Sequence, residues 1–225
     1  MSDESLFREV DEEVRREQLE KLWKRYGNLF IAFSVGLIVA VGAFKGWQYY
    51  QKKQAEAAGE AYVSALDLLD QGKADEARLR LTDLAGGKHK GAAVLARLRL
   101  AGMAQADGKT DEAMALLSKV ADDAAVDAPL RNAAKVRKAW LMVGSAKMDE
   151  LKSLLAGLDV AGNPWRSSAR EILALAAWRA QDLAAMNTYL EAMLNDAGTS
   201  PEARERARIM KGVIAPKLAG SGGRK

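Results

Sequence analysis

The stretch LFIAFSVGLIVAVGAF, residues 29–44, contains no charged residue and no proline. Ten of its sixteen residues are leucine, isoleucine, valine or phenylalanine, and such residues favour insertion into lipid by roughly 3–6 kcal/mol in total. Between Gly27 and Gly46 lie enough residues for about 30 Å of helix, the thickness of a hydrocarbon core. Tryptophan, tyrosine and lysine flank the stretch on both sides, with arginine before it, as they do at membrane interfaces. The sequence therefore predicts one transmembrane helix, over residues 26–47.

Two other interpretations of this stretch are weaker. A cleavable signal peptide has a short basic leader and a small-residue cleavage site. Here the first twenty-five residues carry eight acids and six bases, and the stretch is followed by KGWQYY, which is interfacial in character. A core helix of a soluble domain would keep a polar outer face, and residues 29–44 have none.

The basic residues near the predicted span indicate its orientation. Five precede it (Arg15, Arg16, Lys21, Lys24, Arg25) and three follow it (Lys45, Lys52, Lys53). Because lysine and arginine are enriched on the cytoplasmic side, we expect a single-pass protein with its N-terminus in the cytoplasm. In a Gram-negative bacterium this is the inner membrane, with the C-terminal part in the periplasm. The absence of cysteine is compatible with an oxidising compartment.

Two segments of the N-terminal part are possible contact surfaces for partners. Residues 1–25 form a predicted cytoplasmic helix whose acids lie four residues before bases; it either positions the span or docks a partner. Within the span, Ala32, Gly36 and Ala40 are spaced four apart. Small residues on one face let another membrane helix approach closely, although glycine and alanine are also simply frequent in spans.

The remainder of the chain contains an internal repeat. The string GKADEA (residues 72–77) matches GKTDEA (residues 108–113) at an interval of 36, and weaker copies stand at residues 147–151 and 181–184. Prolines recur at 129, 164 and 201, in the position expected for the first turn of a helix. Alanine- and leucine-rich runs surround each copy, and no run alternates as a strand does. We therefore expect helix pairs, with first helices near residues 55–71, 92–106, 129–143 and 164–180.

A helix–turn–helix unit of this length resembles the tetratricopeptide repeat. The predicted fold is all-α: a transmembrane helix, a helical connector (48–60), a tetratricopeptide-like solenoid of helical hairpins (61–215) and a flexible tail (216–225). One unit cannot bury its apolar face alone, so neighbouring units are expected to stack. Residues 201–215 would close the stack.

The residues needed for catalysis or metal binding are not present in recognisable sets. The chain has one histidine and no cysteine, so a zinc site would lack its usual ligands. The loop GGKHKG (residues 86–91) lacks the lysine–serine or lysine–threonine ending of a phosphate-binding loop. We predict no catalytic residue, metal, cofactor or small-molecule substrate, and no enzymatic activity. Charges are interspersed without a basic stripe, which argues against nucleic-acid binding.

A stacked array of helix pairs instead presents a groove for an extended segment or a partner helix. By their positions in the first helices, Arg97, Asn132, Lys135 and Trp140 are the groove candidates. Trp140 and Trp178 can equally be core residues, which is the commoner role of aromatic side chains at helical spacing.

The whole layout, with Gly46-Trp47 and Tyr49-Tyr50 after the span and repeats beginning near Ala61, resembles the YfgM-type ancillary subunits of the bacterial Sec translocon (SecYEG). That resemblance implies an inner-membrane protein beside the translocon channel, without a catalytic residue. Its implied partners are translocon subunits, periplasmic chaperones and emerging chains. The alternative is a scaffold of the same kind that serves envelope assembly or cell division and has no translocon contact.

Overall fold

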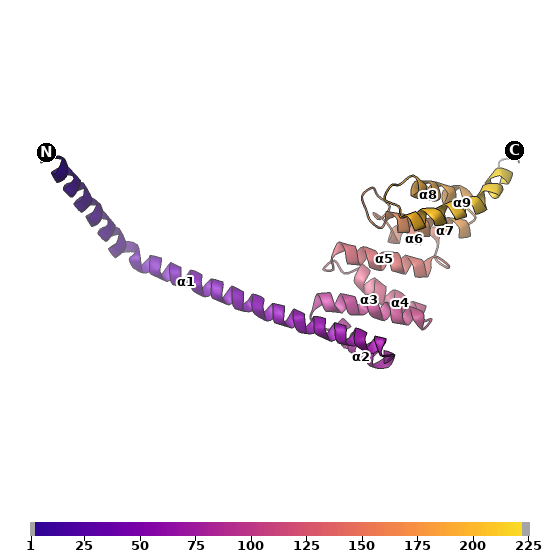
Figure 1. The fold of residues 1–225 in the computed structure, drawn as a ribbon, viewed down its shortest axis with the longest axis horizontal. Helices are drawn as coiled ribbons and strands as arrows, with labels where there is room; N and C mark the ends of the chain where they lie inside the picture. The colour runs from indigo at the N-terminus through magenta and orange to yellow at the C-terminus, as the bar shows by residue number, and fades with distance from the viewer. Residues whose placement is uncertain (1–2, 222–225) are drawn as a thin grey trace. The chain divides into compact units, whose positions relative to one another are not determined.

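The structure is a computed structural model that describes residues 3–221, with side chains described for residues 23–28, 30–33 and 35–219. Every regular element in this range is a helix (Figure 1), which confirms the all-α prediction. The chain divides into two compact units, residues 1–57 and 58–225. The side chains of the predicted cytoplasmic helix up to residue 22 lie outside the described residues.

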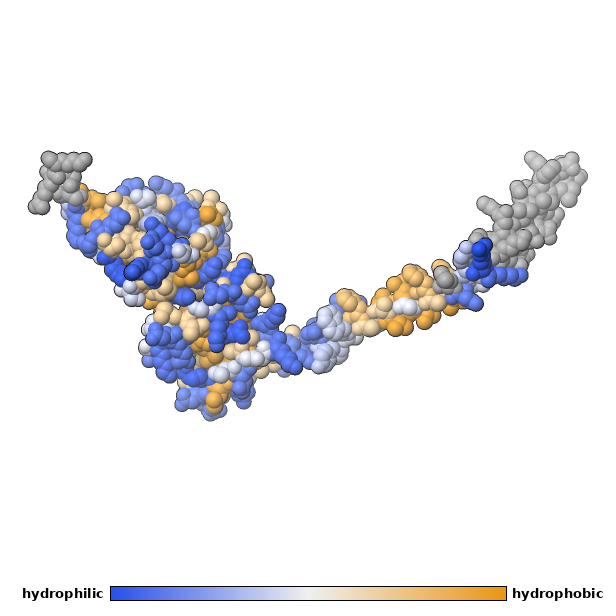
Figure 2. Space-filling model, turned by 180° about the vertical axis from the view of Figure 1, so that it is seen from behind, coloured by the Kyte–Doolittle hydropathy of each residue, from blue (hydrophilic) through white to orange (hydrophobic). Residues whose placement is uncertain are grey.

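Helix α1, Asp3–Asp70, supplies the predicted span. No proline occurs before residue 129, so nothing in the sequence interrupts the helix, and the predicted connector is helical. The side chains of Phe30, Phe33 and Ile38 are 62%, 69% and 71% exposed, and Figure 2 shows the apolar band on this helix. Within the described residues, α1 is the one helix long and apolar enough to cross a membrane.

The second unit is built from the end of α1 and eight further helices. They are α2 (Ala74–Ala85), α3 (Lys90–Ala106), α4 (Thr110–Ala121), α5 (Ala128–Met142), α6 (Met148–Leu154), α7 (Arg166–Arg179), α8 (Leu183–Leu194) and α9 (Pro201–Ser221). The observed α3, α5 and α7 agree within two residues with the predicted first helices of the pairs. From α2 to α9, helices that follow one another in sequence pack side by side.

Glycines in the left-handed region end the first helix of the first two pairs. Gly72 has φ +77° and Gly108 has φ +76°. At the first turn the Lys73 N–H donates to the Leu68 carbonyl at 2.8 Å and the Gly72 N–H to Leu69 at 3.0 Å. This is a Schellman arrangement, and it accounts for the repeated glycine–lysine pair. The fourth pair has the same turn with Gln181 at φ 59°.

The core of the second unit is a chain of four apolar clusters, each shared by three successive helices. The first cluster, formed by α1, α2 and α3, contains Ala65, Leu81, Ala96 and Leu100. Several core positions are alanines with no exposed surface, which lets the helix axes approach closely. Because each cluster bridges to the next pair, the helix pairs stack as predicted.

The third and last helix pairs differ from the prediction. Helix α6 has only seven residues, yet Leu155 and Leu158 beyond its end stay buried. Gly157 and Gly162 adopt positive φ in the following connection, which ends the helix early. Pro164 consequently lies two residues before α7 rather than in its first turn.

The predicted flexible tail is partly wrong. Helix α9 runs to Ser221 with Pro216 inside it, so residues 216–221 are helical, while residues 222–225 lie outside the described range. An internal proline removes a backbone hydrogen bond. Packing offsets this loss, because Ile214 is fully buried and Leu218 contacts the α7–α9 cluster. The Lys217 ammonium lies 4.3 Å from the ring centre of Trp178, and Trp178 is accordingly a core-contacting residue.

Candidate partner-binding surfaces

The small-residue face of the span is open in the structure. Ala32, Gly36 and Ala40 are exposed on α1, and a methyl group added at Gly36 would meet no other atom within 4 Å. Another helix could therefore approach this face to close contact.

The four groove candidates lie on two helices. Arg97 lies on α3 and donates from Nη2 to the Ala85 carbonyl at the C-terminal end of α2, at 2.8 Å. Asn132, Lys135 and Trp140 all lie on α5. Asn132 and Lys135 are half-buried, and Trp140 is 38% exposed. Trp140 thus presents part of its ring to solvent.

Arg97 borders a hollow of about 420 Å³ between α2, α3 and α4. Its lining includes the buried Leu100 and the cations Arg78, Arg97 and Lys119, against one carboxylate, Glu112. Arg78 is already bound by Asp107, with Nη2 and Oδ2 2.5 Å apart. The remaining positive charge makes the hollow suited to an apolar segment that carries acids.

Two arginines that the sequence analysis did not identify tie neighbouring helix pairs together. Arg137 on α5 donates from Nη1 to the Leu98 carbonyl on α3 at 3.3 Å, and a Cβ at Gly102 would lie 3.2 Å from its guanidinium. Arg179 on α7 donates to the Gly144 carbonyl, just after α5, at 3.1 Å. Each arginine reaches the preceding first helix or the residues directly after it. These carbonyls lie far from the arginines in the sequence, so no local sequence pattern predicts the two hydrogen bonds.

Carboxylates near α7 and α9 are saturated by arginines. Glu171, 5% exposed, accepts from Arg206 Nε and Nη2 at 2.6 and 2.8 Å. Asp196 accepts from Arg166 Nε and Nη2 and from Arg170 Nη1. The hydrogen bonds from Arg166 and from the Gly198 N–H hold the pKa of Asp196 well below its ordinary value. Carboxylates held ionised in this way are structural and are poorly suited to proton transfer at neutral pH.

Among the described residues, no group of three or more histidines, cysteines or acids is placed to hold a metal ion. The described hollows between helices have room for a ligand, and half-buried apolar residues together with cations line them.

A family model described as "Tetratricopeptide repeat-like domain" matches residues 20–172. The match begins before the span and ends within α7, so it includes both helices that carry the groove candidates, α3 and α5. No curated protein matches the chain. No solved structure matches it either.

Proposed function

This chain belongs to the tetratricopeptide repeat-like domain family, and we propose that it is a membrane-anchored protein-interaction scaffold. Domains of this family are typically scaffolds without enzymatic activity. Residues 26–47 would anchor the protein as a single span in the bacterial inner membrane. The basic residues before the span favour a cytoplasmic N-terminus, which would place the repeats, residues 61–215, in the periplasm.

This proposal rests on one observation. Helix α1 has an exposed apolar stretch, and the same chain continues after α1 as a stack of helix pairs. Exposed phenylalanine, isoleucine and valine around a whole helix require a non-aqueous environment or a partner. The stacked pairs provide surfaces for proteins, with Arg97, Asn132, Lys135 and Trp140 as the proposed contact residues.

The specific role we propose is that of an ancillary subunit of the Sec translocon that links the channel to periplasmic chaperones acting on emerging chains. The resemblance in layout supports this role, together with the open face of Ala32, Gly36 and Ala40. Translocon subunits would contact this face. The second candidate is a scaffold for envelope assembly or cell division, and the same open face would then contact a different membrane helix.

Photo-crosslinking from the span separates the two roles. A crosslinking amino acid at Gly36 reports on the small-residue face, and one at Ile38 lies about 200° around the helix and serves as its control. Capture of translocon channel subunits from position 36 and not from 38 supports the translocon role. Capture of cell-division or envelope-assembly proteins supports the second candidate, and equal capture from both positions contradicts a specific face.

A further inference from the structure

The connection between α2 and α3 is a basic corner of the second unit. The loop GGKHKG, residues 86–91, contains two lysines and a histidine and no acid. Both Lys88 and Lys90 are exposed. Neither takes part in an ion pair within the described part of the chain. Their charges are therefore available to a ligand.

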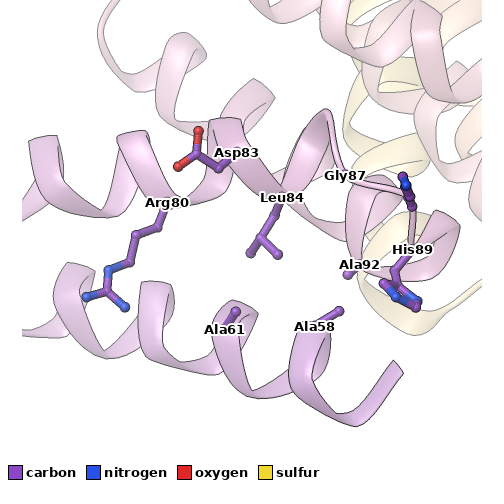
Figure 3. A pocket seen from close by; sticks show the side chains of 9 residues that line it. Ala58, Ala61, Arg80, Asp83, Leu84, Gly87, His89 and Ala92 are labelled. Atoms are coloured by element: carbon purple, nitrogen blue, oxygen red, sulfur yellow. The ribbon is translucent and has the colours of Figure 1, made fainter. Parts of the chain in front are cut away.

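A hollow of about 310 Å³ opens beside this loop, between α1, the C-terminal end of α2 and the start of α3. Its walls are small and apolar, with Ala58 and Ala61 from α1, Leu84 from α2 and Ala92 from α3 (Figure 3). Cations border it: Lys88 from the loop and Arg80, whose Nη1 donates to Ser64 Oγ at 3.1 Å.

One carboxylate, Asp83, borders this hollow together with two cations, Arg80 and Lys88, so the border keeps a net positive charge. Figure 3 shows Asp83 on the side of α2 opposite to Leu84, pointing away from the alanines. The arrangement is an apolar recess with positive charge around its mouth. An anionic group with a short apolar portion complements both features.

The position of this corner along the chain indicates which anion it meets. Ala58, which lines the hollow, is eleven residues (58 − 47) after Trp47, where the proposed span ends. Eleven residues extend no further than about 40 Å in any conformation. The corner is therefore tethered near a bilayer surface, where phosphodiester headgroups are the most concentrated anions.

We propose that the basic corner, formed by residues 86–91 and the adjacent hollow, binds the anionic headgroups of phospholipids at the membrane surface. Lys88 and Lys90 pair with headgroup phosphates, and the exposed lysines concentrate the unit at acidic lipid because each charge near such a surface is attracted to it. This inference rests on the proposed membrane anchoring, since the tether sets the local concentration. An acidic segment of a partner protein is the competing occupant.

The test uses the full chain, which has no cysteine and so accepts single labels. Three cysteines at open positions carry a fluorophore: Gly91→Cys at the last residue of the basic corner, Gly144→Cys after α5, and Gly42→Cys in the span. A Cβ at each of these glycines meets no atom within 4 Å. Each labelled protein is reconstituted into nanodiscs of phosphatidylcholine alone or of an equal mixture with phosphatidylglycerol. A nitroxide lipid in the disc quenches fluorophores at the bilayer.

Headgroup nitroxides should quench the label at position 91 at least about twofold more in discs with phosphatidylglycerol than in discs without it. The difference should disappear in about 1 M salt, where charges are screened beyond about 3 Å. The label at position 144 should show no lipid dependence. The double variant Lys88→Gln with Lys90→Gln should lower the ratio of membrane-docked to free corner by up to about thirtyfold, because it removes two positive charges. Lys147→Gln with Lys152→Gln, an equal charge change on and beside α6, should leave it unchanged.

Two failures are distinguishable. If acyl-chain nitroxides do not quench the label at position 42, the span is not in the bilayer and the proposed anchoring fails. If position 42 is quenched but position 91 responds equally to both lipid compositions, the lipid inference alone is overturned. The lysines would then be open to an acidic protein segment.

Discussion

Replacing the turn glycine Gly108 by alanine should destabilise the repeat domain by about 1 kcal/mol. Its φ is +76°, and the left-handed backbone conformation costs a residue with a side chain about 1–2 kcal/mol of free energy. About 0.4–1 kcal/mol of this cost is offset, because alanine makes the unfolded chain less flexible than glycine does. Gly72, at φ +77° in the equivalent turn, should behave alike. The two losses should add to about 2 kcal/mol, since the turns belong to different helix pairs.

The measurement is a urea titration of the purified full-length protein in detergent micelles, followed by tryptophan fluorescence. With a slope of about 2 kcal/mol per M, each alanine should lower the midpoint by about 0.5 M. Gly91→Ala is the matched control, because Gly91 is a helical residue whose added Cβ would meet no neighbour. It should raise stability by about 0.5–1 kcal/mol.

The reverse substitution tests the same reasoning. Gln181 holds the left-handed position of the fourth pair at φ 59°, so Gln181→Gly should be neutral or stabilising by up to about 1 kcal/mol. The turn argument is refuted if Gly108→Ala and Gly91→Ala shift the midpoint in the same direction by the same amount.

Three further substitutions test the core and its ion pairs. Leu151→Ala, at a fully buried leucine of α6, should lose about 3 kcal/mol in thermal unfolding, whereas Leu79→Ala, 69% exposed, should stay within about 0.5 kcal/mol; similar losses would contradict the packing described. Glu171→Gln leaves an arginine of α9 without its buried carboxylate and should cost about 2 kcal/mol, and an equal loss from the exposed Glu205→Gln would speak against a special pair. The lowered pKa of Asp196 stabilises the folded state above the carboxyl's ordinary pKa of about 4, and this contribution is lost as pH falls toward the folded pKa. Asp196→Asn should therefore flatten the stability profile between about pH 5 and pH 3, and an unchanged profile would exclude this carboxylate as its source.

Much of the fold follows from local features of the sequence. The span is evident because sixteen uncharged residues in a row, apolar except for Ser34, have no polar face, and glycines end the first helices of the first two pairs. The two glycine–lysine strings correspond to two turns with the same backbone conformation. These features are local, so one sequence is sufficient to read them.

The remaining features depend on tertiary contacts. Pro216 predicts a helix end, but buried Ile214 and the packed Leu218 extend α9 past it. Leu151, Leu154, Leu155 and Leu158 have helical spacing, but α6 ends at Leu154, and Gly157 turns the chain while Leu158 stays in the core. Packing overrides local propensity at both places.

The candidate site is harder to predict than the fold. Arg97 on α3 borders a hollow of three helices, and the other three candidates lie on α5. The hydrogen bond from Arg137 to a carbonyl 39 residues away corresponds to no periodic pattern in the sequence. The assignments of Ala32, Gly36, Ala40 and the groove residues to partners, and the domain boundaries, stay predictions.

The most direct test of the account is fractionation of cell membranes after an alkaline carbonate wash. An integral single-span scaffold should remain in the membrane pellet, be released by mild detergent, and enter the supernatant as a folded domain when residues 29–44 are deleted. Recovery of the intact chain in the supernatant without detergent would contradict the account.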